Sequence, residues 1–388
     1  MNTDRPPRNE TSGQSVGAAD ARIPFADPRA DLTHLRAEIV AAITRVVDSG
    51  HYVLGSEVKL IEENLAKRIG VAGAIGVGSG TDAIVLALLA VGVGPGDEVI
   101  TVSHTAGATV AAIRMIGAVP VLVDVVPATY CLDPGKLEAA ASMRTKAILP
   151  VHLYGHPADL GAICAFGRSH GVPVVEDCAQ AQEAIIDGRP VGSIGEAGCF
   201  SFYPTKTLGA IGDGGLVSAS SRETYERVLH LRTYGWVTPQ FSDFAGGRCS
   251  RLDELQAAIL NVKLAQLSQD VEKRRAIAKR YDEAFVGLPI VRPTELPGYR
   301  HVYHLYVIRA KKRDALAQHL DAAGISTGMH YQYPVHVQPG LMAGARVAGS
   351  LAVTETIVEE ILSLPIYPSL SVERQDRVIA AVRSFFAP

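Results

Sequence analysis

The sequence has no run of apolar residues that is long and clean enough to span a lipid bilayer. Even TDAIVLALLAVGVG, at residues 81–94, is too short and leads straight into polar loop residues. Residues 1–22 also lack the apolar core of a secretory signal. They are polar and rich in Pro, Gly, Ser and charge, which predicts a disordered tail. These absences argue against a membrane protein and against a secreted one.

A strong charge of either sign and a cysteine framework are lacking too. The 37 basic and 40 acidic side chains give a net charge of −3, which argues against a nucleic-acid partner, because such proteins normally carry a basic surface. Five cysteines are present, an odd number, and no Cys-x-x-Cys pair occurs. We therefore expect reduced thiols in a cytoplasmic protein rather than disulfides.

What the chain does contain is a regular alternation of short apolar runs and helical stretches from about residue 73 onward. The runs are continuously apolar rather than alternating, which predicts strands with both faces covered. We expect these strands at 72–77, 97–102, 119–125, 146–153, 172–177, 198–203 and 214–219, with helices at 81–92 and 108–117. Alternating strands and helices predict an α/β domain with a mainly parallel sheet.

A different pattern follows this domain. Residues 250–267 have helical spacing, and Ser250 with Asp253 forms a capping box that predicts the helix start. The helix is expected to continue to residue 285 as a long connector. A strand at 301–310 and helices at 313–324 and 371–386 then predict a smaller α+β unit. We therefore divide the chain into a tail over 1–22, a large domain over 23–271 and a small domain over 272–388.

Unusual residues follow three of the predicted strands, and ligands of a parallel sheet bind outside the carboxyl ends of its strands. The first group is GSGTDA at 78–83, where glycines and a helix start offer free N–H groups to a phosphate, with the hydroxyl of Thr81 beside them. A plain tight turn with a helix cap is the alternative for this group.

The second and third groups contain a carboxylate and an amine. Asp177 ends a buried strand and could cap the next helix, or stay ionised and hold a proton on a heterocyclic nitrogen. FSFYPTKTLGAIGDGG, at 200–215, places Ser201 where it can bind phosphate and Lys206 where it can form a Schiff base, although an exposed loop lysine is the alternative. Together the three groups predict a pyridoxal-phosphate site.

These segments resemble the DegT/StrS family of pyridoxal-phosphate-dependent sugar aminotransferases. The resemblance runs from about residue 25 to the C-terminus through GSGTDAIVLAL, GDEVITVSHTAGATVAAI, GAVPVLVDV, ILPVHLYGHPADL, VPVVEDCAQA, FSFYPTKTLGAIGDGG, SRLDELQAAIL and HYQYPVHVQP. It implies an α/β fold of the aspartate-aminotransferase-like (type I) class, with a large mainly parallel-sheet domain and a smaller C-terminal domain. It also implies a homodimer with shared active sites, a nucleotide-linked keto-sugar as amino acceptor and L-glutamate as donor.

The resemblance also assigns roles to single residues. It implies that Lys206 is the Schiff-base lysine and that Asp177 is the partner of the pyridine nitrogen. Gln180 matches the residue near the phenolic oxygen of the cofactor. The residues that match phosphate contacts are Gly80, Thr81 and Ser201.

The sequence departs from the family pattern at three places. Ala106 stands where an aromatic side chain often stacks on the cofactor, and we consider His104 as its replacement. Cys249 stands where an asparagine often reaches the phosphate of the neighbouring subunit, and a thiol is a poor donor. Gln182 and Glu183 replace a common His-Gly pair.

The substrate contacts are less defined by the sequence. Candidates are His330, Tyr331 and His336, in a loop of the predicted small domain, and Arg251. We expect no metal, because His152 and His156 flank a Tyr-Gly turn without a third ligand nearby.

Two other functions stay open. One is a sugar dehydratase, although known ones replace the lysine with histidine. The other is a non-catalytic regulator that binds a sugar nucleotide. We lean toward amination at C3 of a dTDP-linked 6-deoxy sugar, with C4 as the alternative.

Overall fold

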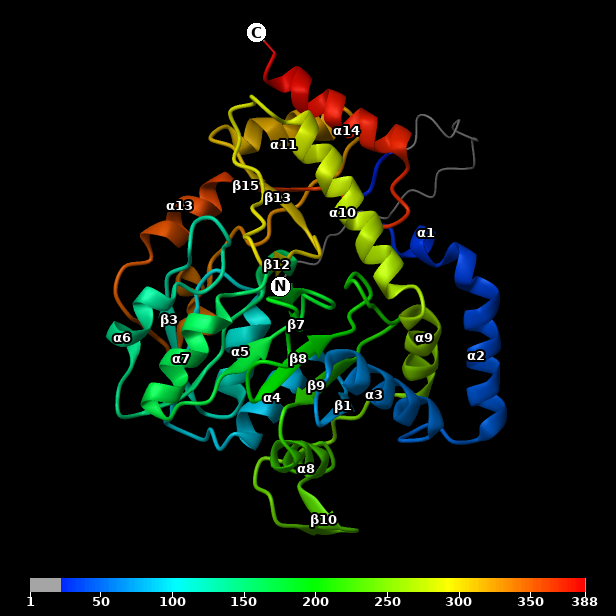
Figure 1. The fold of residues 1–388 in the computed structure, drawn as a ribbon, viewed down its shortest axis with the longest axis vertical. Coiled ribbons are helices and arrows are strands. Elements are labelled where there is room, and N and C mark those ends of the chain that lie inside the picture. The colour runs from blue at the N-terminus through cyan, green and yellow to red at the C-terminus, as the bar shows by residue number, and fades with distance from the viewer. Residues whose placement is uncertain (1–21, 388) are drawn as a thin grey trace, which may run out of the picture.

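The computed structural model describes residues 22–387. Figure 1 shows a broad lower part built on a twisted sheet and a smaller upper part formed mainly by the C-terminal third of the chain. The predicted tail over 1–22 lies outside the described residues, except for Arg22. Within the described range, no helix combines the length and apolar character needed to cross a membrane.

The large sheet consists of two runs of four strands, in the orders β14-β3-β2-β4 and β5-β8-β9-β1. Parallel bridges between Ile148 and Val174 and between Val151 and Asp177 join the runs. Neighbouring strands are parallel except at β9, which is antiparallel to β8 and β1. The strands are β1 Gly73–Val77, β2 Glu98–Val102, β3 Val119–Val123, β4 Thr145–Ile148, β5 Val175–Asp177, β8 Ala197–Ser201, β9 Gly215–Ala219 and β14 Arg346–Val347. The mainly parallel α/β sheet predicted from the sequence is confirmed.

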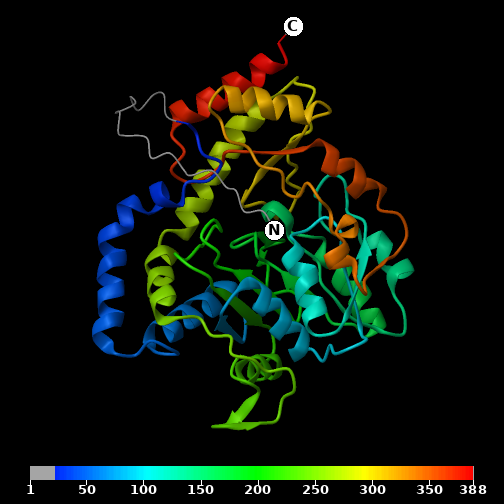
Figure 2. The same cartoon turned by 180° about the vertical axis from the view of Figure 1, so that it is seen from behind.

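Helices cover both faces of this sheet, which explains why its strands are apolar throughout: every residue of β1, β2, β8 and β9 is buried. Of the helices from the N-terminal third, α3 packs on one face of the sheet and α4 on the other. Figure 2 shows a third helix, α2, at the outer edge of the molecule, where it packs against α9. The helices of this part are α1 Pro28–Leu32, α2 Arg36–Ser49, α3 Ser56–Ile69, α4 Gly80–Ala90, α5 Gly107–Met115, α6 Leu137–Ala140, α7 Leu160–His170, α8 Arg222–Leu231 and α9 Glu254–Leu264.

The upper part is built on α10, α11 and α14, which pack around a two-stranded antiparallel pair, β13 with β15 (Figure 1). Its elements are α10 Leu267–Ala284, β13 Tyr306–Arg309, α11 Arg313–Ala322, β15 Ile361–Leu364 and α14 Val372–Phe385. The same stretch of sequence also contains α12 Pro339–Met342, which packs against α5 of the lower part, and α13 Ala352–Glu360. β14 also comes from this stretch of sequence but pairs with β3 of the large sheet. The division at residue 271 stays a prediction.

Two smaller sheets complete the fold. One is a hairpin that projects from the lower end of the molecule in Figure 1. The other joins a hairpin after β5 to a short strand that follows α10. Their strands are β10 Trp236–Thr238 with β11 Phe241–Ser242, and β6 Ile185–Ile186 and β7 Arg189–Pro190 with β12 Tyr299–Arg300.

The predicted connector helix over 250–285 is wrong in two respects. The chain forms two helices, α9 and α10, separated at residues 265 and 266. The capping box does not form either: Asp253 is the N-cap residue of α9, and the Ser250 hydroxyl instead donates to Asp82 Oδ2 at 2.9 Å and accepts from the Gly78 N–H at 3.0 Å. The Ser250 side chain therefore binds the glycine loop, which is distant in sequence, and does not cap the helix as its local spacing predicts.

Candidate active site

The strands of the large sheet bring the polar groups predicted from the sequence to one edge. β5 ends at Asp177 and β8 ends at Ser201, while Gly78 follows the end of β1. These three strands point the same way, so their carboxyl ends meet at the same edge. β9 runs in the opposite direction and begins at this edge with Gly215, so the loop that contains Lys206 closes over the same edge.

Lys206 lies in the loop between β8 and β9, and its backbone N–H donates to the carbonyl oxygen of Tyr203 at 2.8 Å. No hydrogen bond or ion pair engages its ammonium group within the described residues. Burial lowers the pKa of Lys206 to about 8, and the charge of Asp177 opposes this shift. The side chain is therefore a partly desolvated amine beside a carboxylate, which is the state that a nucleophilic lysine requires.

Asp177 is buried and is held by two donors. The Thr109 hydroxyl donates to Oδ2 at 2.9 Å, and the backbone N–H of Ala179 donates to Oδ1 at 3.1 Å. Burial raises the pKa of Asp177, while these hydrogen bonds and the charge of Lys206 act in the opposite direction. A cationic N–H placed against this carboxylate would offset the burial penalty, so the site favours a protonated heterocycle as its ligand.

The start of α4 forms an anion-binding cradle. The Ser79 hydroxyl caps the helix by accepting from the Asp82 N–H at 3.1 Å, which leaves the N–H groups of Gly80 and Thr81 free for a ligand. A Cβ on Gly80 would lie 2.7 Å from the Cβ of Ser201, so only glycine lets the helix start approach this strand. The structure thus brings Gly80, Thr81 and Ser201 together at one place.

Gln180 connects the strand edge to the loop from the C-terminal third. Its Oε1 accepts from the backbone N–H of Tyr154 at 2.7 Å, and its Nε2 donates to the hydroxyl oxygen of Tyr331 at 2.9 Å. His330 adjoins Tyr331 and stacks on Phe25, with 5.1 Å between ring centroids. Burial and the nearby charge of Lys206 lower the pKa of His330 to about 4, so the imidazole is neutral.

A cavity of about 340 Å³ lies against Lys206 and is lined by several of these side chains. Gln180, His330 and Tyr331 line it together with Arg274. The cavity is large enough for a small polar substrate, and its walls offer amide, imidazole, phenol and guanidinium groups to such a molecule.

Three other predicted residues lie away from this cavity. The Nδ1 atom of His336 is 2.7 Å from the Ser103 hydroxyl, and its Nε2 lies 3.6 Å from Glu355. Cys249 is exposed, and its sulfur accepts from the Arg251 guanidinium at 3.0 Å. The structure therefore pairs two of the candidates with each other but does not bring them to Lys206 within one chain.

His104 is fully buried next to Tyr154, and its Nε2 lies 2.7 Å from the tyrosine hydroxyl. That hydroxyl donates to the carbonyl oxygen of His330, so His104 must be the donor in the first contact. Burial lowers the pKa of His104 to about 4, which keeps the ring neutral. Its role in covering the cofactor face stays a prediction.

His152, Glu176 and Cys178 form a tight cluster whose ligand atoms lie within 4.8 Å of one another. The acceptor atoms of His152 and Glu176 are already in use. His152 Nδ1 accepts from the Ala158 N–H at 2.9 Å and Nε2 donates to Glu176 at 3.0 Å, and the same carboxylate accepts three backbone N–H groups from residues 192–195. This cluster fixes a loop and offers no open set of ligands for a metal.

Sequence reasoning missed two contributors to the site. Thr109 lies on α5 and holds Asp177, and Thr105 in turn lies 2.9 Å from the Thr109 hydroxyl. Arg274 stands in the run EKRR of α10, and only its burial distinguishes it from the basic residue that follows. From the sequence alone, a threonine in an apolar helix or one arginine among several basic residues cannot be recognised as part of a binding site.

We expect the lowered pKa of Lys206 to be visible in its reaction with added pyridoxal phosphate. The unprotonated amine attacks the aldehyde, so the rate should rise with pH and level off above about 8. An ordinary lysine would level off only above about 10.4. Stopped-flow absorbance on cofactor-free protein measures this rate. Burial also lowers the pKa of Lys263 to about 8, so the rate measured with the Lys206→Ala variant is subtracted as the contribution of that second lysine. An inflection of the native rate above pH 10 would contradict the expectation.

Comparisons with known proteins agree with this geometry. The sequence matches the DegT/DnrJ/EryC1/StrS aminotransferase family over residues 33–383. The dTDP-3-amino-3,4,6-trideoxy-alpha-D-glucose transaminase of Streptomyces venezuelae is 45% identical over 96% of this chain and 98% of its own. A pleiotropic regulatory protein of Geobacillus stearothermophilus is 42% identical over 94% of this chain and 98% of its own. The crystal structure of Streptomyces venezuelae DesV in complex with a ketimine intermediate superposes with a TM-score of 0.91 at 45% identity, covering 95% of this chain and 99% of DesV.

The fold and the site define an aminotransferase of the aspartate-aminotransferase-like class. More particularly, the chain belongs to the DegT/DnrJ/EryC1/StrS aminotransferase family, which depends on pyridoxal phosphate and includes sugar transaminases. The family resemblance and the fold class expected from the sequence are both confirmed.

Proposed function

We propose that this protein binds pyridoxal 5'-phosphate and transfers an amino group from L-glutamate to a nucleotide-linked keto-sugar. The observation that supports this most strongly is the Lys206 amine beside the buried Asp177. Burial lowers the pKa of this amine to about 8. When bound, pyridoxal phosphate takes up the amino group at its aldehyde carbon and the electron pair that is released at the substrate carbon.

The residues of this chain fit that cofactor. Gly80 and Thr81 would hold its phosphate through their free N–H groups, and Ser201 through its hydroxyl. Asp177 would accept a hydrogen bond from the protonated ring nitrogen, since within residues 22–387 each of its carboxylate oxygens accepts from a single donor. Lys206 Nζ would remove the proton from the donor's α-carbon in the first half-reaction and return a proton to the sugar carbon in the second.

We place the amine at C3 of a dTDP-linked 6-deoxy sugar. The Streptomyces venezuelae relative, which is named for a 3-amino dTDP sugar, supports this position. Tyr331, which accepts from Gln180, and His330 line the cavity beside Lys206 and are the proposed contacts to the sugar. The product would be an amino sugar for polysaccharide or natural-product glycosylation.

A homodimer with shared active sites is part of the proposal. Tyr203 and Ile211 lie on either side of Lys206 in its loop, and they expose 52% and 48% of their surface. Large apolar side chains exposed around a site are typical of an interface. The exposed Cys249 and the half-buried Arg251 are the further contacts that we propose to the partner subunit. A cytoplasmic location is proposed too, since all five cysteines are free.

The test is a panel of nucleotide-linked keto-sugars, offered with L-glutamate to the cofactor-loaded protein and analysed by product mass. A dTDP-linked 3-keto-6-deoxy sugar should give an amino sugar together with 2-oxoglutarate. The 4-keto isomers and the UDP-linked sugars are the matched comparison, and faster conversion of any of them would overturn the assignment of the acceptor. Failure of the whole panel would overturn the proposed reaction.

A regulatory role is the second candidate, because the Geobacillus stearothermophilus relative is named a pleiotropic regulatory protein. A regulator without catalysis has no need of a reactive lysine. An absorption spectrum of the purified protein before and after borohydride distinguishes the two, since only an imine at Lys206 is reduced and fixed covalently. Lys206 also argues against a dehydratase, in which histidine would be expected at this position.

A further inference from the structure

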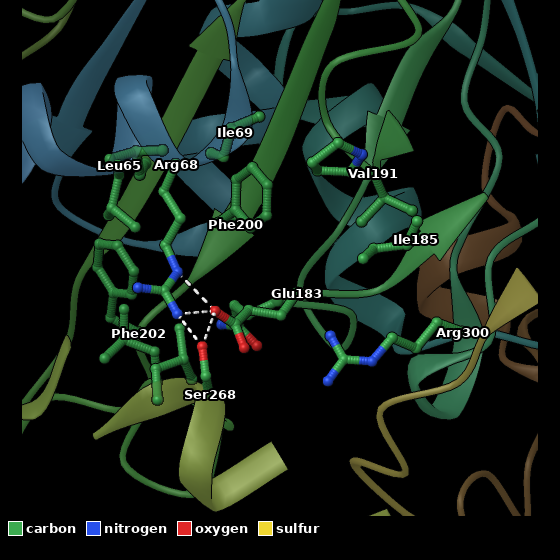
Figure 3. A pocket seen from close by; sticks show the side chains of 15 residues that line it. Leu65, Arg68, Ile69, Glu183, Ile185, Val191, Phe200, Phe202, Ser268 and Arg300 are labelled. Atoms are coloured by element: carbon green, nitrogen blue, oxygen red, sulfur yellow. Dashed lines mark hydrogen bonds and ion pairs between the residues drawn. The ribbon is translucent and has the colours of Figure 1, made fainter. Parts of the chain in front are cut away.

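A second cavity, of about 140 Å³, lies apart from Lys206 between α3, β8, β9 and the start of α10. Figure 3 shows apolar side chains on most of its wall, among them Leu65, Ile69, Phe200 and Phe202. None of the residues that line the catalytic cavity lines this one. It is therefore separate from the catalytic cavity.

This cavity lies behind the phosphate cradle. Phe200 and Phe202 line it, while Ser201 between them contacts Gly80 at the start of α4. Side chains alternate along a strand, so the two phenylalanines and the serine point to opposite faces. A molecule in the cavity would therefore press on the back of the segment that holds Ser201.

Two buried acceptors at this cavity have no donor. Gln182 is buried and lines the wall; its Nε2 donates to the Ser201 carbonyl oxygen at 2.7 Å, but its Oε1 has no partner among the described residues. Glu183 Oε1 accepts from Arg68 and Ser268, as the dashed lines in Figure 3 show, while its Oε2 is buried and has no partner in the part of the chain that the structure describes. Buried acceptors are nearly always hydrogen-bonded, so these two point to a missing donor.

The backbone at Glu183 supports the same conclusion. Its φ is +67°, a left-handed conformation that side chains other than glycine rarely adopt. The Arg68 guanidinium and the Ser268 hydroxyl hold the carboxylate of this residue beside the cavity. Strained residues of this type cluster at ligand sites and switches.

We propose that this second cavity binds a small neutral aromatic molecule that carries one O–H or N–H donor. The ring would lie among Leu65, Phe200 and Phe202, and the Gln182 amide would turn so that Oε1, which is otherwise packed away from the cavity, accepts from the donor of the ligand. A cavity of about 150 Å³ is large enough for one benzene-sized ring. A neutral ligand is favoured because Arg68 and Glu183 offset each other's charge and Arg300, also on the wall, is paired with Glu272.

Phenol and toluene make a matched pair of probes, because they have nearly the same shape and differ in the donor. Calorimetry on the cofactor-loaded protein should show phenol binding roughly ten times more tightly than toluene, since only phenol satisfies the buried acceptor. Crystals soaked in 4-bromophenol should place the bromine anomalous peak within this cavity. Equal affinity for the two probes, or a bromine peak only elsewhere, would overturn the proposal.

Two variants test the assigned contacts. Gln182→Leu removes the acceptor and should abolish the preference for phenol while toluene still binds. Val191→Phe, at another wall position, should fill the cavity and abolish binding of both probes. Circular dichroism and thermal unfolding check that each variant folds. If phenol binds Val191→Phe as tightly as the native protein, the ligand is bound elsewhere and the proposal fails; the comparison of probes on native protein stands even if a variant does not fold.

Discussion

Replacing Lys206 by alanine or by arginine lowers kcat for amino transfer by about 10⁴-fold or more. Alanine removes the amine that both bonds to the cofactor and moves the proton. Arginine keeps the positive charge but cannot be deprotonated in a protein, so it can neither attack an aldehyde nor act as a base. Steady-state assays with L-glutamate and the best keto-sugar of the panel measure the loss.

A matched control for these variants is Lys279→Ala, which removes an exposed lysine on α10 that is paired with Glu283. Its activity should equal that of the native protein. The Lys206 variants should also lose the absorbance change that borohydride causes in the native protein, which shows that the imine, and not only turnover, is missing. Substantial residual transamination by either Lys206 variant would refute the role assigned to this side chain.

Replacing Asp177 by asparagine lowers kcat by about 10²–10³-fold, the second largest effect that we expect. The amide keeps the size of the side chain but loses the charge that would hold a proton on the ring nitrogen. Burial raises the pKa of Asp177 in the cofactor-free protein, so the charged form is disfavoured there. The free energy of unfolding of the cofactor-free protein should therefore fall little, and urea denaturation measures it.

Thr109→Val is the companion variant for Asp177. It removes the hydroxyl that donates to Oδ2 but leaves the carboxylate and the Ala179 N–H in place. Its kcat should fall by roughly tenfold, in line with one lost hydrogen bond to a charged group. If Asp177→Asn retains nearly full activity, or if Thr109→Val is the more damaging of the two, the carboxylate does not hold the ring proton.

Local patterns sufficed to predict the strands and the residues at their ends. Continuous apolar runs marked β1, β2, β5 and β8, because a strand buried on both faces consists mostly of apolar residues. The parallel arrangement then gathered Asp177 and Gly80 at one edge. The direction of β9 escaped this reasoning, since a short apolar run reads the same in a parallel and in an antiparallel pair.

Contacts between distant segments could not be found in this way. Ser250 has the spacing of a helix cap, but its hydroxyl donates to Asp82, 168 residues away in sequence. Gln180 and Tyr331 are 151 residues apart and form one hydrogen bond beside the catalytic cavity. No local propensity encodes such a pair, because both side chains suit a loop equally well without the contact.

The replacement of a His-Gly pair by Gln182 and Glu183 shows the same difference between what local sequence predicts and what only the fold reveals. The sequence shows the change only as a departure from the family pattern. Only the fold revealed that Glu183 has a left-handed backbone, that Arg68 holds it in place and that a cavity lies beneath. A dihedral angle and an unpaired oxygen atom are properties of three-dimensional packing.

The sequence by itself determined the class of fold and the chemistry of the edge, because apolar periodicity and the residues that follow each strand are local properties of the chain. The tertiary structure alone decided the pKa of Lys206, the donors to Asp177 and the existence of a second cavity. These depend on burial and on side chains that are distant in sequence, and desolvation is set by everything packed around a group rather than by its neighbours in the chain.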